Sequence, residues 1–336
     1  MEQTGAQQVF FQHIRNTLPP HISLVDEIAE LLNISTDSAY RRIRGEKLIS
    51  FDEIRTLCSH FKISLDQLFY LNSESIIFSG GLTNNKNYGF DIYLQNILDH
   101  LININSFERR ELISLNKDII FHDFNFHDLT SFRLFFWMKT VLQYPLFGKA
   151  LFDSDDFTES LHQTVKKIMT EYNKIPSQEI WNMENIQSII YQIEYYKETK
   201  VFASAQDILN LYECLLKTVD HIERQAEAGY KFQPGGKPLQ TNATYKLYVN
   251  EFILGDNTIV AVLNDLKVVY IPHTVLNYLH TKDTAFAEYT YQHFQNIIRK
   301  STLISDVGEK ERSRFFNTMR EKIDDHRKSA LQYNVD

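Results

Sequence analysis

Two short helical patterns, separated by a turn of three residues, constrain the fold of this chain more than any other feature. The first places apolar side chains at helical spacing from Leu24 to Leu32, with acidic residues on the opposite face. Asn33 follows it, and asparagine tolerates the left-handed conformation that ends a helix. Ser35 is a suitable N-cap for the second pattern, which continues to Arg44 and is stopped by Gly45. These spacings predict two short helices joined by a tight turn.

This segment resembles the repressor/Cro-like family of helix-turn-helix domains. The matching features are Ala29, the Ile34-Ser35 turn, Arg41, the Arg44-Gly45 pair and the downstream run FDEIRTLCSHFKISLDQLF. The resemblance implies that this run forms a fourth helix and a short fifth helix, with residues 10–18 as the first. The chain departs from the family at Asn33, where glycine is usual, and at Arg42, which occupies a slot that is usually apolar while Ile43 is displaced by one position.

The resemblance also implies which residues meet DNA, because the second helix of this motif, here 35–44, enters the major groove. The frame residues are Ala29, Asn33, Ser35, Ile43 and Gly45, and the base-reading positions are Thr36, Asp37, Tyr40 and Arg41. Arg41 can form two hydrogen bonds with guanine, Asp37 can accept one from a cytosine amino group, and Thr36 can meet a base edge or a thymine methyl group. Phosphate contacts are expected from Arg42, Arg44 and Lys47. The bland alternative is that these arginines form a solvated helix face and that Asp37 only supports the cap.

Net charge alone does not indicate a nucleic-acid partner, since the whole chain carries −8. The local charge differs, because the segment YRRIRGEK, residues 40–47, holds four cations and one anion. Two cysteines, Cys58 and Cys214, lack the spacing of a disulfide framework or a zinc module, which favours a reducing cytoplasm. The N-terminus lacks the pattern of a secretory signal, and the most apolar stretch, 132–147, is too short and too charged for a bilayer. We therefore expect a cytoplasmic protein that has no membrane partner.

The rest of the chain predicts a second, larger domain. Residues 1–72 form the helix-turn-helix domain in this interpretation, residues 73–87 a linker rich in Asn, Ser and Gly, and residues 88–336 a helical effector or oligomerisation domain. Amphipathic helices are expected at 90–104, 107–120, 127–143, 156–173, 177–198, 203–228, 273–278 and 285–304, followed by a charged C-terminal helix. A small antiparallel β-meander is expected near 244–271. The predicted fold class is mainly α.

No catalytic constellation, cofactor site or metal site is predicted, so the chain is not expected to be an enzyme. The segment HDFNFHD, residues 122–128, brings two histidines and two aspartates together, but their spacing suits neither one helix face nor one strand face, and a surface loop is the default interpretation. In the C-terminal helix, an apolar stripe could pack within the chain or pair with a second subunit; it consists of Phe315, Phe316, Met319 and Ile323.

Three functional hypotheses remain open at this point. The first is a transcriptional regulator that binds double-stranded DNA as a homodimer through its C-terminal domain, since helix-turn-helix dimers read two half-sites. The second is a sensor whose helical domain is gated by a peptide or a small metabolite. The third is an interaction adaptor or an enzyme that uses the helix-turn-helix domain only for attachment.

Overall fold

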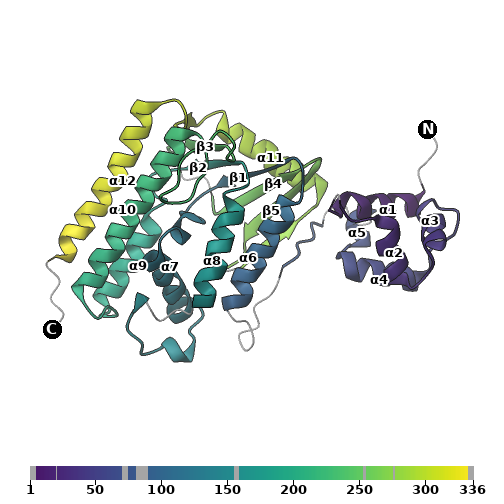
Figure 1. Ribbon diagram of the computed structural model, residues 1–336, viewed down its shortest axis with the longest axis horizontal. Helices are drawn as coiled ribbons and strands as arrows, with labels where there is room; N and C mark the ends of the chain where they lie inside the picture. Colours follow the sequence, from purple (N-terminus) through teal and green to yellow (C-terminus); the bar gives the residue numbers. More distant parts are fainter. Residues whose placement is uncertain are drawn as a thin grey trace.

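The computed structural model of the 336-residue chain describes residues 5–19, 21–69, 75–80, 90–154, 159–252, 255–274 and 277–331. Figure 1 shows a small helical domain at the N-terminus, in purple and dark blue, beside a larger domain that combines helices with a sheet. Of the predicted linker 73–87, residues 73–74 and 81–87 lie outside the described residues.

The N-terminal domain consists of five helices, as the resemblance implies for this region. Their bounds are α1 Ala6–Thr17, α2 Leu24–Leu32, α3 Thr36–Ile43, α4 Phe51–Phe61 and α5 Leu65–Leu68. One side chain from each of the first four helices is fully buried at the centre: Ile14, Ile28, Ala39 and Leu57. The domain therefore has an apolar core of its own, separate from that of the larger domain.

The larger domain contains a seven-stranded mixed sheet, so the prediction of a mainly α, or all-α, fold with a small meander was wrong. The strand order is β6-β5-β4-β1-β2-β3-β7; β1, β2 and β3 are parallel, and the other neighbouring pairs are antiparallel. The strand bounds are β1 Arg110–Leu115, β2 Ser177–Trp181, β3 Tyr245–Val249, β4 Thr258–Leu263, β5 Leu266–Pro272, β6 Tyr278–Thr281 and β7 Thr302–Leu303.

Helices cover both faces of this sheet. Most pack on one face, whereas α11 lies on the other, behind the sheet in Figure 1. Alternation along β1 divides its side chains between the two layers, because Leu112 faces the larger layer and Ile113 faces α11. The helix bounds are α6 Phe90–Asn105, α7 His127–Phe136, α8 Glu159–Tyr172, α9 Gln187–Glu198, α10 Ala205–Ala228, α11 Thr284–Ile298 and α12 Glu309–Ala330, with short turns η1 His122–Phe124, η2 Trp137–Val141 and η3 Pro145–Phe147.

Four strands lie where helices were predicted. β1 occupies the expected helix 107–120 and β2 the start of 177–198, while β6 and β7 lie at the ends of 273–278 and 285–304. β1 and β2 are parallel central strands with residues buried on both faces, and their sequences, RELISL and SQEIW, mix polar and apolar residues without a clear alternation. Segments this short cannot be distinguished from part of a buried helix by their periodicity.

The apolar stripe of α12 packs within the chain. Phe316, Met319 and Ile323 are fully buried, and α12 lies along α10, as Figure 1 shows at the side opposite the N-terminal domain. This stripe is therefore unavailable as a contact with a second subunit. No helix among the described residues is both long enough and apolar enough to cross a bilayer.

A segment of the expected linker joins the sheet edge. The backbone N–H of Ser79 donates to the carbonyl of His280 in β6 at 2.7 Å, and the N–H of His280 donates back at 2.8 Å. The hydroxyl of Thr281 donates to the carbonyl of Ile77 at 2.7 Å. The chain that leaves the helical domain is thus hydrogen-bonded to β6.

Candidate nucleic-acid interface

Backbone conformation and capping hold α2 and α3 in place. The hydroxyl of Ser35 accepts from the N–H of Ser38 at 3.3 Å, which satisfies one of the free donors at the start of α3. Asn33 has φ of 50° and ends α2 in the left-handed conformation, while Gly45 follows α3 at φ of 81°. Ala29 is buried between α2 and its neighbours, and Ile43 is half-buried against the same core. These five frame residues lie where a tight two-helix unit needs them.

One face of α3 is exposed to solvent. It carries Thr36, Asp37, Tyr40, Arg41 and Arg44, at positions that recur on one side of a helix. The opposite face is buried, with Ala39 and Arg42 facing the domain. The structure thus brings together on one surface all four residues expected to read bases.

Arg42 lies inside the domain, although the sequence suggested a phosphate contact. It is 6% exposed, and its guanidinium pairs with the carboxylate of Glu53 in α4, with an Nη2 to Oε1 distance of 2.7 Å. Its Nη1 also donates to the hydroxyl of Ser38 at 2.6 Å. Burial raises the pKa of Glu53, but hydrogen bonds from Arg42 and Ser50 lower it by more than burial raises it. The pKa of Glu53 therefore lies below its usual value. Arg42 therefore stabilises the packing of α3 on α4, and we exclude it from the DNA-contacting set.

The remaining cations lie around the C-terminal end of α3. The guanidinium carbon of Arg44 is 4.5 Å from the centre of the Tyr40 ring, and Arg44 Nη2 donates to the Tyr40 hydroxyl at 3.1 Å. Glu46 lies 3.5 Å from Arg44 and 4.0 Å from Arg41, and all of these side chains are about half exposed. Lys47 is exposed in the turn that follows. Exposed ion pairs of this kind are weak, so both arginines can exchange Glu46 for a stronger anion.

Gln7 in α1 holds the turn that follows α3, a role that was not predicted from the sequence. Its Nε2 donates to the carbonyls of Arg42 and Lys47, both at 2.7 Å, and its Oε1 accepts from the N–H of Ile49 at 3.1 Å. One side chain thus fixes both ends of the turn after α3. The available signal was its spacing, because Gln7 shares a helix face with the buried residues Phe11 and Ile14, where a polar side chain needs partners.

Segment 122–128 is not a surface loop as expected. His122 and Asp123 are 1% and 4% exposed. His122 Nε2 lies 3.2 Å from both carboxylate oxygens of Glu179 in β2, and Asp123 pairs with Arg133 in α7. The residues that the structure describes include no group of three or more His, Cys, Asp or Glu that could hold a metal ion.

The two described cysteines are unpaired; Cys58 is half-buried in the helical domain and Cys214 is buried in the larger one. Burial raises the pKa of the Cys214 thiol to about 11, and the carboxylate of Asp128 acts in the same direction. Neither thiol is activated as a nucleophile by these surroundings. Comparison of the chain with protein-family models, with curated proteins and with solved structures finds no match.

Proposed function

We propose that this protein is a sequence-specific DNA-binding transcriptional regulator of the helix-turn-helix type. The observation that carries the proposal is the exposed face of α3, where Thr36, Asp37, Tyr40 and Arg41 lie together on a helix of eight residues held by its neighbours. A helix face that only contacts solvent would not require α3 to be held in this way. α3 is capped, follows a three-residue turn and is fixed to α4 through Arg42. These features support the interpretation that its exposed face binds a partner.

In this proposal each side chain has a distinct role in the major groove. Arg41 reads a guanine through two hydrogen bonds, Asp37 accepts from a cytosine, and Thr36 contacts a base edge or a thymine methyl group. Arg44, held by Tyr40, and Lys47 neutralise phosphates, and the N-terminus of α3 attracts another.

We further propose that the regulator acts in the cytoplasm as a homodimer. Two DNA-binding heads are needed to read two half-sites, and the larger domain is the part of the chain available to join them. The stripe of α12 is not the contact, because it is buried against α10. In this proposal, another surface of the larger domain forms the contact between the two subunits.

The test compares three single-charge removals in the full chain, measured as binding to a library of randomised duplex DNA. Arg41→Ala is expected to cost about 1–3 kcal/mol at one base position and to relax the preference there. Lys47→Ala is expected to weaken binding evenly across sequences and to reduce its salt dependence. The matched control is Arg15→Ala, which removes an exposed arginine of the same domain from the far end of α1.

The control should bind with the affinity and preference of the unchanged protein. If Arg41→Ala and Lys47→Ala both weaken binding equally on every sequence, the base-reading role of Arg41 is contradicted. If the unchanged protein selects no sequence from the library, the proposed function itself is wrong.

A further inference from the structure

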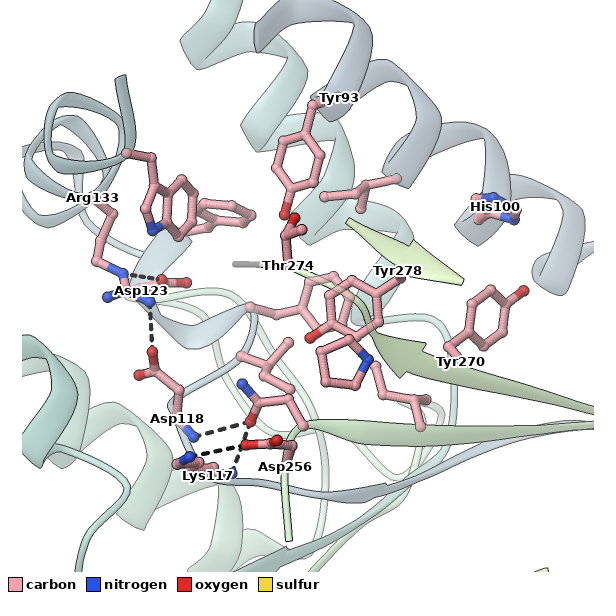
Figure 2. A pocket seen from close by; sticks show the side chains of 18 of the residues that line it. Tyr93, His100, Lys117, Asp118, Asp123, Arg133, Asp256, Tyr270, Thr274 and Tyr278 are labelled. Atoms are coloured by element: carbon pink, nitrogen blue, oxygen red, sulfur yellow. Dashed lines mark hydrogen bonds and ion pairs between the residues drawn. The ribbon is translucent and has the colours of Figure 1, made fainter. Parts of the chain in front are cut away.

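A cavity of about 500 Å³ lies in the larger domain, a volume within the range of small-molecule sites. It is lined by α6, the chain that follows β1, the C-terminal end of α7 with Trp137 after it, α9, and the ends of β4, β5 and β6 (Figure 2). An exposed ion pair stands at its rim, where Lys117 Nζ lies 2.9 Å from Asp256 Oδ1. The cavity does not belong to the candidate DNA interface and uses none of its residues.

Aromatic and aliphatic side chains form most of the wall. The aromatic ones come from five different elements, and they are Tyr93, Phe121, Phe124, Trp137, Tyr270 and Tyr278. Figure 2 shows Tyr93, Tyr270 and Tyr278 around the part of the cavity that lies away from Arg133. Such a wall fits an apolar body, and ring faces also attract cations.

The opposite end of the cavity is polar and tightly hydrogen-bonded. The three nitrogens of Arg133 each donate to a different partner: Nε to Asp123 at 2.9 Å, Nη1 to Gln192 at 2.7 Å and Nη2 to Asp118 at 2.6 Å. Asp118 also accepts from the hydroxyl of Ser188 at 3.0 Å. Because two carboxylates already surround this guanidinium, it does not form a receptor for an anion.

One carboxylate oxygen at this end has no hydrogen-bond partner among the described residues. Asp123 uses Oδ2 for Arg133, whereas its Oδ1 accepts no described hydrogen bond, although the side chain is 4% exposed and lines the cavity. A buried carboxylate with an unused acceptor oxygen at a cavity wall points to a ligand group that donates a hydrogen bond to it.

The charges of the wall favour one class of ligand. Three acidic residues and two basic ones line the cavity, so its described wall carries one excess negative charge: Asp118, Asp123 and Asp256 against Lys117 and Arg133. We propose that this cavity binds an organic amine with an apolar body, whose ammonium group pairs with Asp123 while its body lies among the tyrosines. This inference goes beyond DNA binding and does not depend on it.

Binding of this kind is expected to depend on pH. Burial raises the pKa of Asp123 to about 6; Arg133 from α7 and His122 from η1 lower it, and Asp118 raises it. Asp123 in turn contributes to raising the pKa of Tyr278 in β6, so this hydroxyl also lies within electrostatic reach of the carboxylate. Since only the ionised carboxylate attracts an ammonium group, affinity should fall about tenfold between pH 7 and pH 5.

The experiment measures binding of three matched probes to the full chain by calorimetry. The cation is 2-phenylethylamine, its neutral counterpart is 2-phenylethanol, and its anionic counterpart is 3-phenylpropanoate. We expect a dissociation constant below about 1 mM for the amine, and binding at least about tenfold weaker for each of the other two.

Variants separate the polar end from the cavity itself. Asp123→Asn should weaken amine binding at least about tenfold and abolish its pH dependence, whereas Asp265→Asn, at an exposed carboxylate outside the cavity, should change neither. Ile97→Trp should fill the cavity from α6 and abolish binding without altering the charges. If the variants at Asp123 or Ile97 fail to fold, the comparison of the three probes on the unchanged protein still decides.

Two results would overturn the proposal. One is the absence of amine binding up to 10 mM, about ten times the expected limit. The other is equal affinity for the amine and for its neutral or anionic counterpart. That result would show that the cavity binds apolar molecules without a role for Asp123, whose ion pair with Arg133 would then be only structural.

Discussion

Arg42 shows how far one residue can differ from its apparent role. In the sequence it belongs to a cationic run, but its place on α3 turns it toward Glu53 and leaves its neighbour Arg41 in solvent. Helical geometry decides this, because adjacent residues lie about 100° apart around the helix. A partly buried ion pair between Arg42 and Glu53 therefore joins α3 to α4.

The role of Arg42 can be tested by its removal. Arg42→Ala leaves Glu53 partly buried without its partner, and we expect the free energy of unfolding of the N-terminal domain to fall by about 2 kcal/mol. Hydrogen exchange of the α3 and α4 amides in the full chain measures this change. Arg55→Ala, at an exposed arginine of α4, is the control and should stay within about 0.5 kcal/mol of the unchanged protein. Unaltered exchange in Arg42→Ala would show that the pair has no structural role.

At the scale of elements, the helix caps were predictable and the central strands were not. Ser23, Ser35, Asn33 and Gly45 signal helix ends through local chemistry, and each lies at the end of a helix in the structure. β1 has no local signal of this kind, because its neighbours in the sheet come from residues 177–181 and 258–263. Pairing between segments that are distant in sequence leaves little trace in one short apolar run.

The same limit applies to the two sites. The exposed face of α3 could be predicted from residues 35–44 because a single helix builds it. The cavity could not, since Asp123, Gln192 and Tyr278 come from segments far apart in the sequence and meet only when the sheet is formed. The only hint was the unusual density of His and Asp in 122–128, which is explained by the buried contacts of His122 and Asp123.

The packing of α12 gives a prediction at this scale. Phe316→Ala removes a fully buried ring between α12 and the rest of the domain, which should lower the free energy of unfolding by about 3–5 kcal/mol. Phe252→Ala, at a ring that is 72% exposed, is the control and should change it by less than about 0.5 kcal/mol. Both are measured by denaturant unfolding at two protein concentrations. A loss that depended on concentration would place Phe316 in a contact between subunits.

In the whole molecule, β6 lies between the proposed cavity and the segment that follows the helical domain. β6 supplies Tyr278 to the wall of the cavity and, two residues later, His280 to the hydrogen bonds with Ser79. The segment around Ser79 leads toward the helical domain, which carries α3 (Figure 1). A ligand that moves β6 would therefore act on the segment that follows the helical domain.

The central claim, that α3 reads DNA, is tested most directly by genomic footprinting of the full-length protein in its own cell. We expect enriched sites that share one sequence, arranged as two inverted half-sites about 10 base pairs apart, centre to centre, as a symmetric pair of DNA-binding domains requires. An enriched sequence with a single half-site would support sequence-specific DNA binding by α3 but contradict the proposed homodimer. Footprinting that finds no enriched sequence would contradict the claim.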